Sequence, residues 1–471
     1  MDYDLLVIGS GPAGEKGAAQ VAWSGKRVAM VEKAAPHVGG ACTNTGTLPS
    51  KTLRESALAL TGMTSRGLEA AVLALPRPWA ADTLMHRERL VVDSERARIF
   101  RNLDRHQVEL IAGTAAFLDE HTVQLAESGR KITASVFLIA TGSRPHRPAW
   151  IPFAETEIYD SDEILEIETV PESMIVLGSG VIACEYACIF AALGTHVTLM
   201  DGRDRLLSFL DVELGDRFTA ELERLGLWLR LGDDPIACVI DPSTRACTVT
   251  AKSGRSEGAA AVLAAAGRSG NSTGLGLEKL GIEPDKRGNI AVNEHFQTRL
   301  SHVYAAGDVI GFPGLASTSM EQGRVAMCHA FGLGYKTRVS PLLPYGIYTI
   351  PEMSYVGATE EELKKAGRSY LAGRASMADN ARGEILGAGS GFLKLLFAVG
   401  DKRLLGVHIL GPSATELIHI GQMALLQNAT IDLFIDAVFN YPTLSELYKY
   451  AAYDGLGALA RLEAKPQVKP P

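Results

Sequence analysis

Two segments of the chain carry the same glycine-rich pattern in the same register. The first runs Leu5-Leu-Val-Ile-Gly-Ser-Gly-Pro-Ala-Gly14 and continues to Glu32, and the second runs Met174-Ile-Val-Leu-Gly-Ser-Gly-Val-Ile-Ala183 and continues to Asp201. Each shared position recurs 169 residues later, which pairs Gly9 with Gly178, Gly11 with Gly180, Gly14 with Ala183, Gly25 with Gly194, and Glu32 with Asp201. A match that holds register from the first glycine to the acid indicates two copies of one structural unit.

Each copy is typical of a dinucleotide-binding site. An apolar strand leads into a glycine turn, an alanine-rich helix and a second apolar strand that ends in a carboxylate. The first glycine makes the turn, the second lets the backbone approach a pyrophosphate, and the third position lets helix and strand pack closely. The pyrophosphate lies at the helix N-terminus, and the acid binds a ribose. The repeat therefore predicts an α/β fold with two Rossmann-like domains.

A shorter repeat marks where each nucleotide domain closes. Residues 137–144 and 262–268 are both short apolar strands that end in a glycine turn. We expect a first nucleotide domain over 1–147 and 270–340, interrupted by a largely helical stretch near 50–105, and a second over 148–269. A mixed α+β domain should follow over 341–463, and the proline-rich tail over 464–471 is expected to be disordered.

The composition is that of an ordinary globular protein, with 46% hydrophobic and 21% charged residues. A net charge of −8 argues against a nucleic-acid partner. We find no apolar run long enough for a membrane span and no signal peptide before the strand-like start at Tyr3. We expect no disulfide framework and no metal site, and a cytoplasmic location. Five cysteines are expected to pack as small hydrophobes: Cys184, Cys188, Cys238, Cys247 and Cys328.

Further motifs distinguish the two nucleotide sites. The first glycine segment is followed by Gly39-Gly-Ala-Cys-Thr-Asn-Thr-Gly-Thr-Leu-Pro-Ser-Lys51, and a later strand ends in Val303-Tyr-Ala-Ala-Gly-Asp308. With these motifs the chain resembles the flavoprotein disulfide reductases over nearly its whole length. The resemblance implies FAD at the first glycine loop and a nicotinamide nucleotide at the second. It also implies a C-terminal dimerisation domain, and so a homodimer or a larger homo-oligomer.

The same resemblance implies the residues of both sites. Those expected at FAD are Gly9, Gly11, Pro12, Ala13, Gly14, Glu32, Lys33, Gly40, Cys42, Thr43, Lys51, Thr141, Gly142, Gly307, Asp308 and Ala316. Those expected at NAD(H) or NADP(H) are Gly178, Gly180, Val181, Ile182, Glu185, Asp201, Arg203, Arg205 and Gly267. Asp308 is implied on the ribityl side of the flavin, and Lys51 and Glu185 as an ion pair beside its N5 atom.

The chain departs from these reductases at the groups that handle a dithiol. The second cysteine of the family motif is replaced by Thr47, and a threonine can form neither a disulfide nor a thiolate. Tyr441 stands where the family has a histidine, ahead of Glu446. A phenol, with an ordinary pKa of about 10, is a poorer base at neutral pH than an imidazole at about 6.5. Because both groups are changed together, we expect a function without a redox-active disulfide.

The pattern of changes is similar to one branch, the soluble pyridine nucleotide transhydrogenases. Residues 42–51, 204–211, 345–352 and 439–448 carry that similarity. The branch implies hydride exchange between NADPH and NAD in a ping-pong cycle at one nicotinamide site. We expect Lys51 to stabilise the reduced flavin and Thr47 to fill the space of the missing thiol, with Cys42 a spectator. Tyr441 and Glu446 are expected to reach the flavin of the other subunit.

Asp201 bears on the choice between the two nucleotides. It should bind a free 2′-hydroxyl and repel a 2′-phosphate, at a cost of about 4 kcal/mol, roughly a thousandfold in affinity, for charges at about 4 Å. A guanidinium from Arg203 or Arg205 on the phosphate would offset that cost. Alternatively, both arginines face solvent. We expect dual use, with NAD(H) preferred.

Three other functions remain open on the sequence. One is an NAD(P)H diaphorase that passes electrons to quinones, dyes or oxygen. The second is a dihydrolipoamide dehydrogenase with unusual residues, against which Thr47 and Tyr441 argue. The third is a flavin-bearing redox sensor or assembly subunit, for which the chain offers only the short tail from Ala464 as an interaction segment.

Overall fold

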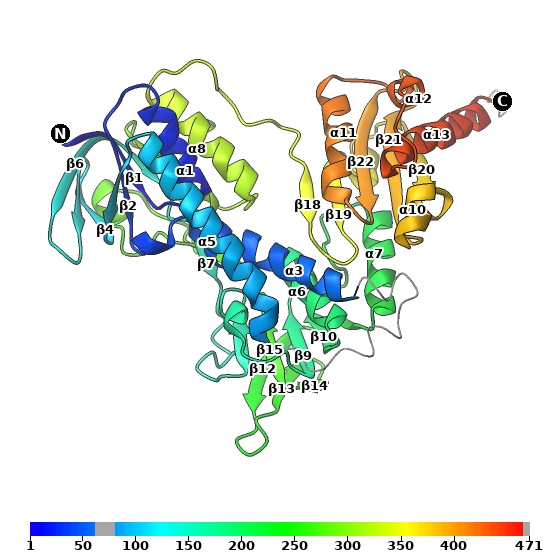
Figure 1. Ribbon diagram of the computed structural model, residues 1–471, viewed down its shortest axis with the longest axis horizontal. Helices are drawn as coiled ribbons and strands as arrows, with labels where there is room; N and C mark the ends of the chain where they lie inside the picture. Colours follow the sequence, from blue (N-terminus) through cyan, green and yellow to red (C-terminus); the bar gives the residue numbers. More distant parts are fainter. Residues whose placement is uncertain (62–80, 465–471) are drawn as a thin grey trace. The chain divides into compact units, whose positions relative to one another are not determined.

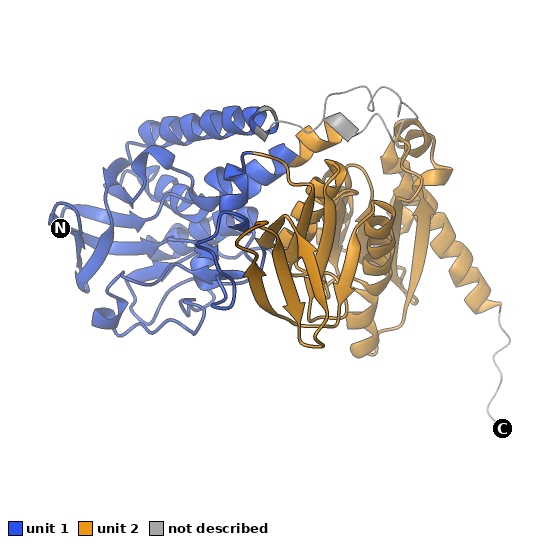
Figure 2. Ribbon diagram, turned by 90° about the horizontal axis from the view of Figure 1, so that it is seen from below, with its two compact units in different colours: residues 1–53, 80–168, 264–340 blue, residues 54–79, 169–263, 341–471 orange. Residues whose placement is uncertain are grey.

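The computed structural model describes residues 1–61 and 81–464 (Figure 1). The chain divides into two compact units (Figure 2). The first unit comprises residues 1–53, 80–168 and 264–340, and the second comprises residues 54–79, 169–263 and 341–471. The second unit thus joins the second glycine segment to the C-terminal segment, and the three predicted domains with their boundaries stay a prediction.

The first unit is built on a mostly parallel sheet in the order β3-β2-β1-β6-β5-β4, with β17 also paired to β6. The strands of that sheet are β1 (Tyr3–Ile8), β2 (Val28–Glu32), β3 (Glu109–Ala112), β4 (Ala115–Asp119), β5 (Thr122–Leu125), β6 (Lys131–Ile139) and β17 (Val303–Ala305). The first unit also contains β7 (Ser143–Pro145), β8 (Ile158–Asp160) and β16 (Arg268–Gly270), and β7 pairs with β16. Strands β1, β2, β6 and β17 run parallel to one another, so their carboxyl ends gather at the edge where the first glycine loop lies.

Helices cover this sheet. They are α1 (Pro12–Ala22), α2 (Gly40–Asn44), the start of α3 (Thr47–Thr61), α5 (Ala81–Arg105) and α8 (Ala316–Ala330), and α1 and α8 pack side by side (Figure 1). Helix α1 begins directly after Gly11 with Pro12 in its first turn, where the missing N–H of proline breaks no helical hydrogen bond. Helices α3 and α5 confirm the expected helical stretch for the part of it that is described.

The second unit repeats the same construction. Strands β11 (Trp228–Leu231), β10 (His196–Asp201), β9 (Ser173–Leu177) and β15 (Ala261–Ala264) follow one another in its sheet, with α6 (Val181–Ala192) and α7 (Val212–Arg224) in the connections. A small antiparallel sheet adds β12 (Pro235–Ile240), β13 (Cys247–Ala251) and β14 (Ser256–Ala259). Helix α6 is buried on nearly every side, which its alanine-rich and cysteine-containing sequence allows.

The C-terminal part of the second unit is an antiparallel sheet with helices on it. The strand order is β18-β19-β22-β21-β20, from β18 (Tyr345–Ile347), β19 (Met353–Gly357), β20 (Tyr370–Ser376), β21 (Phe392–Ala398) and β22 (Leu404–Leu410). The helices are α9 (Glu360–Lys365), α10 (Ala381–Leu386), α11 (Ala414–Leu426), α12 (Asp432–Asp436) and α13 (Leu447–Glu463). The predicted tail falls outside the described residues except for Ala464.

Two composition-based expectations can be compared with the structure. The five cysteines expected in apolar surroundings are all buried, whereas Cys42 is half-buried. Within the described ranges, no helix has both the length and the apolar character needed to cross a bilayer.

Candidate active site

The first glycine loop has the shape of a phosphate-binding turn. Gly9 has a φ of +104°, and a Cβ there would lie 2.4 Å from the carbonyl oxygen of Ala140. A Cβ on Gly14 would lie 2.0 Å from the carbonyl oxygen of Gly9, so helix and strand pack without room for a side chain. At Gly11 the nearest atom to such a Cβ is 3.9 Å away, and no side chain caps α1. The helix N-terminus is therefore open to an anion that approaches Gly11.

Glu32, at the end of β2, is held against this loop by backbone and side-chain donors. Its Oε2 atom accepts hydrogen bonds from the backbone N–H and the hydroxyl of Ser10, at 2.9 and 2.8 Å. Its Oε1 atom accepts one from the N–H of Ala34 at 3.0 Å. The Ser10 hydroxyl also accepts from the N–H of Gly39 at 3.0 Å, which fastens the Gly39–Gly40 turn to the glycine loop.

A chain of polar groups leads to Asp308. Arg268 Nε donates to the Ser143 hydroxyl at 2.8 Å, and that hydroxyl donates to Asp308 Oδ2 at 2.9 Å. The N–H of Gly307 donates to the buried side chain of Gln322 at 2.9 Å. Ser10, Ser143 and Arg268 were not predicted. The serine inside Gly-Ser-Gly could have indicated Ser10, but no short motif links Ser143 to Arg268.

These groups fit FAD. An uncapped helix N-terminus suits a pyrophosphate, the Glu32 carboxylate beside it suits a ribose, and Asp308 at the end of a polar chain suits a polyol. The remaining predicted residues lie on the same elements: Pro12 and Ala13 on α1, Lys33 directly after β2, Thr141 and Gly142 after β6, and Ala316 at the start of α8.

Cys42 and Thr47 lie together at the adjoining ends of α2 and α3. Burial raises the pKa of the Cys42 thiol above its usual value, and a hydrogen bond with the Thr47 side chain only partly opposes this. Cys42 is therefore a neutral thiol at neutral pH. Lys51, one turn into α3, has its Nζ 3.3 Å from the Ser50 hydroxyl. Thr43 is buried on α2, and Gly40 packs against Gly11 of the glycine loop.

The second glycine loop has the same geometry. Gly178 has a φ of +123°, and Ala183 is fully buried where helix and strand meet. No described heavy atom lies within 4 Å of a Cβ added at Gly180, and the N-terminus of α6, where Val181 and Ile182 lie, has no side-chain cap. The donors of a second pyrophosphate site are therefore present.

Asp201 ends β10 beside this loop and is bound by Arg203. The Arg203 guanidinium donates to both carboxylate oxygens, at 3.0 and 2.9 Å, and its backbone N–H donates at 2.8 Å. Burial alone would raise the pKa of Asp201, but the hydrogen bonds and the charge of Arg203 hold the pKa below its usual value. Arg205 is instead paired with Asp216 at 2.7 Å. The carboxylate thus carries its own counter-charge.

The segment from Asp201 to Asp211 is fixed at its middle and at its far end. The N–H of Leu207 donates to the carbonyl oxygen of Ser179 at 2.9 Å. Asp211, just before α7, forms a buried ion pair with Lys394 of β21, with 2.8 Å between Nζ and Oδ1 and no exposure of either side chain. Lys394 also pairs with Glu213 at 3.1 Å. This segment is one that the resemblance had singled out, and the structure shows it to be the rim of the second glycine loop.

The other predicted residues lie on separate elements. Glu185, on α6, is 4% exposed and accepts a hydrogen bond from the N–H of Tyr348 at 2.8 Å. Tyr441 is 75% exposed, and Glu446 directly precedes α13. Gly267 belongs to the first unit, whereas the other residues predicted for the nicotinamide nucleotide belong to the second. The Lys51–Glu185 ion pair and the approach of Tyr441 and Glu446 to a flavin stay predictions.

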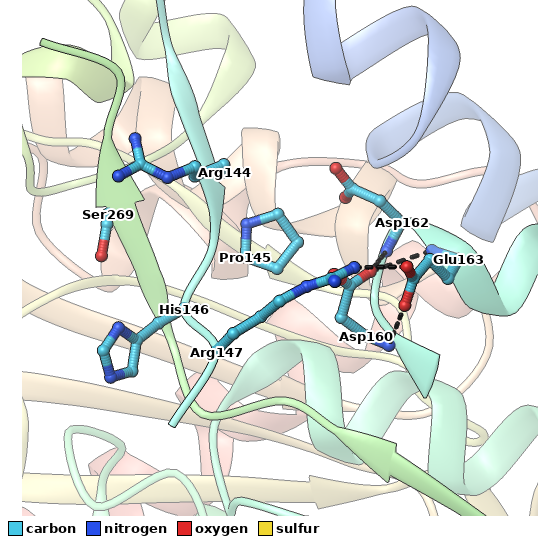
Figure 3. Close-up of a pocket in the computed structure, with 8 residues that line it drawn as sticks. All are labelled: Arg144, Pro145, His146, Arg147, Asp160, Asp162, Glu163 and Ser269. Carbon is cyan, nitrogen blue, oxygen red and sulfur yellow. Dashed lines mark hydrogen bonds and ion pairs between the residues drawn. The ribbon is translucent and has the colours of Figure 1, made fainter. Parts of the chain in front are cut away.

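A cavity of about 480 Å³ lies in the first unit beside β7 and β16. Figure 3 shows Arg147 reaching across its wall to Asp160 and Glu163, with 2.7 Å between Arg147 and Asp160. Arg144 Nη1, on the other side, donates to the Asn271 side chain at 3.1 Å. Arg147 is paired with two carboxylates and Arg144 is hydrogen-bonded to an amide, so the cavity walls give no reason to place a reacting group there.

Comparison with known proteins agrees with this geometry. Residues 3–323 match the pyridine nucleotide-disulphide oxidoreductase family, and residues 343–452 match the dimerisation domain of that family. A protein of Mycobacterium bovis named soluble pyridine nucleotide transhydrogenase is 45% identical, with 98% of each chain covered. One of that name from Pectobacterium atrosepticum is 40% identical, with 97% of this chain and 98% of the relative covered.

A solved structure agrees as well. LpdA from Mycobacterium tuberculosis superposes with a TM-score of 0.86 at 26% identity, over 95% of this chain and 99% of the other. The chain therefore belongs to the pyridine nucleotide-disulphide oxidoreductase family, and within it to the branch of the soluble pyridine nucleotide transhydrogenases.

Proposed function

We propose that the chain catalyses hydride transfer between NADPH and NAD, with the two nucleotides taking turns at the second glycine loop. FAD, held at the first glycine loop, would supply the chemistry, because a flavin can take up a hydride and give it back. The observation that carries the proposal is Thr47, whose hydroxyl lies beside the neutral thiol of Cys42. With no second sulfur there, electrons have no protein disulfide to enter and must leave on a diffusible acceptor.

The second unit supports one site for both nucleotides. Its glycine loop offers one helix N-terminus and one ribose-binding carboxylate, and Arg203 already neutralises that carboxylate. A neutral Asp201–Arg203 pair repels a 2′-phosphate much less than a bare Asp201 would. The names of the relatives, which are transhydrogenases, agree with use of both nucleotides.

The roles proposed for the other residues are those that the family resemblance implies. Lys51 brings a positive charge to the start of α3, where it would stabilise negative charge on a reduced flavin. Glu185, which is buried on α6, would form an ion pair with Lys51 beside the flavin, as the resemblance implies. Tyr441 and Glu446 close the site from the second subunit of a homodimer.

Anaerobic titration tests the proposal. NADPH should reduce the flavin by two electrons without a thiolate-to-flavin charge-transfer band, and addition of thio-NAD should then reoxidise it. Thr47→Ser, which keeps a hydroxyl, should behave in the same way. Rapid turnover of lipoamide or glutathione disulfide would contradict the proposal. Quinone reduction with no transfer to thio-NAD would favour the diaphorase instead.

A further inference from the structure

The equivalent serines of the two glycine loops differ in their hydrogen bonding. Ser10 and Ser179 occupy the same repeat position, as do Glu32 and Asp201. In the first loop the Ser10 hydroxyl donates to Glu32 at 2.8 Å and accepts from Gly39. In the second loop the Ser179 hydroxyl is fully buried, and it is one of two buried side-chain polar groups in the described chain that lack a hydrogen-bond partner.

The difference follows from side-chain length and from Arg203. Aspartate is one methylene shorter than glutamate, and Asp201 makes its side-chain hydrogen bonds with Arg203 and none with the Ser179 hydroxyl. The Arg203 side chain is 54% exposed, whereas Asp201 is 13% exposed. The arginine can therefore turn into solvent while the carboxylate stays beside the serine. A buried hydroxyl without a partner is uncommon, and here its neighbour is the group that meets the ribose.

We propose that Ser179 is a positioning residue that lets one ribose pocket accept both NAD(H) and NADP(H). With NAD(H), Arg203 stays on Asp201, and the carboxylate accepts hydrogen bonds from the ribose. With NADP(H), Arg203 turns to the 2′-phosphate, and Asp201 accepts the hydrogen bond that Ser179 has available. This inference rests on the proposed function in assuming that both nucleotides use the second loop.

Neither state leaves the charge of Asp201 or of Arg203 without a partner. When Arg203 leaves, Asp201 loses two charge-assisted bonds but keeps the backbone N–H of Arg203 and gains the Ser179 hydroxyl. The guanidinium meanwhile finds a phosphate, for which its planar pair of donors is well suited. A second acid, Asp234, packs against Gly202 on the same rim. A phosphate without a guanidinium would therefore be repelled twice.

Binding of two fragments to the FAD-loaded protein tests the exchange. By calorimetry, Ser179→Ala should raise the Kd of 2′,5′-ADP about tenfold and leave that of 5′-AMP within about twofold. In stopped-flow reduction of Ser179→Ala, the concentration of NADPH that gives the half-maximal rate should rise about tenfold and that of NADH should change little. The limiting rates should stay unchanged. Arg203→Ala should weaken 2′,5′-ADP by about a hundredfold or more.

Thr195→Val is the matched control. Thr195 is also a buried hydroxyl in this unit, but it lies beyond the other end of α6 and donates to the carbonyl oxygen of Pro171 at 2.8 Å. Its replacement should lower thermal stability and leave the ratio of the two Kd values unchanged. Equal effects of Ser179→Ala on both fragments, or no effect on either, would overturn the inference. Because each fragment binds without hydride transfer, that result stands whether or not transhydrogenation is observed.

Discussion

The hydroxyl of Thr47 beside the Cys42 sulfur leaves the protein without a second thiol at this position, and therefore without a redox-active disulfide there. Thr47→Cys would put two thiols at the adjoining ends of α2 and α3, where the present side chains already contact each other. We expect this variant to form a disulfide in air and to take up four electrons in a dithionite titration, where the parent takes up two. Thr47→Ser is the control. Uptake of two electrons by both variants would mean that the two residues are too far apart to be bridged.

At the same scale, the sequence predicts which residues matter better than it predicts their partners. The motif predicted Asp201, Arg203 and Arg205 at the nucleotide site, which stays a prediction, and left open whether the arginines bind a 2′-phosphate or face solvent. The structure pairs Arg203 with Asp201 and Arg205 with Asp216, a choice fixed by backbone geometry that spacing does not contain. Lys394 and Asp211 lie 183 residues apart, so no local pattern could have joined them.

The two glycine turns allow a paired prediction at the scale of single elements. Gly11 and Gly180 both have room for a methyl group in the folded chain, yet that group would lie where a pyrophosphate approaches. Gly11→Ala should fold normally by circular dichroism and purify with most of its flavin lost. Gly180→Ala should keep its flavin and bind both NADH and NADPH at least tenfold more weakly, a loss of about 1.4 kcal/mol or more. Similar flavin loss in both variants would refute the assignment of the loops.

The ion pair between the start of α7 and β21 should be a main source of stability in the second unit. Lys394→Met leaves Asp211 buried without its counter-charge, so we expect a loss of about 3–5 kcal/mol in the free energy of urea unfolding. Lys402→Met is the matched control, because it breaks the partly exposed pair with Asp432 at a cost of about 1 kcal/mol or less. Comparable losses of unfolding free energy in the two variants would show that burial does not increase the cost of breaking the Lys394–Asp211 pair.

Acid should weaken the same cluster. Burial alone would raise the pKa of Glu213, but a hydrogen bond from Arg374 and the charge of Lys394 lower it to about 2. A glutamate in an unfolded chain titrates near pH ~4.3, so this contribution is complete above that pH and is lost as the pH falls toward about 2. The unfolding free energy should decline below about pH 4.3. The unfolding free energy should decline less steeply with falling pH in Lys394→Met. Equal slopes in the variant and the parent would show that Glu213 is not the source of the decline.

Over the whole molecule, the repeat at 169 residues predicted the architecture well. The α/β fold with two glycine-loop units, the FAD and pyridine nucleotide cofactors and the oxidoreductase class are confirmed. The domain boundaries and the site residues as a set stay predictions. The grouping of residues 169–263 with the C-terminal segment was not foreseen, because it arises from long-range contacts such as that of Asp211 with Lys394.

Assembly is the remaining property of the whole molecule. The match to a dimerisation domain agrees with exposed apolar side chains on the C-terminal part, among them Val438 at 93% and Leu433 at 48% exposure. We expect light scattering to give at least twice the chain mass of 50.3 kDa. Val438→Asp should shift the protein toward the monomer and lower its transhydrogenase rate with the flavin retained. A fully active monomer would contradict the proposed role of Tyr441 and Glu446.

The hydrogen bonds that Ser10 makes in the first loop affect the residence time expected for each ligand. Ser10 joins the glycine loop, the β2 acid and the Gly39 turn, so three chain segments hold the proposed FAD loop in one fixed conformation. In the second loop the side chain of the acid is held by one exposed arginine, Arg203. One ligand should thus have a residence time of hours and the other of milliseconds, and the purified enzyme should stay yellow through dialysis and need no added flavin in its assay.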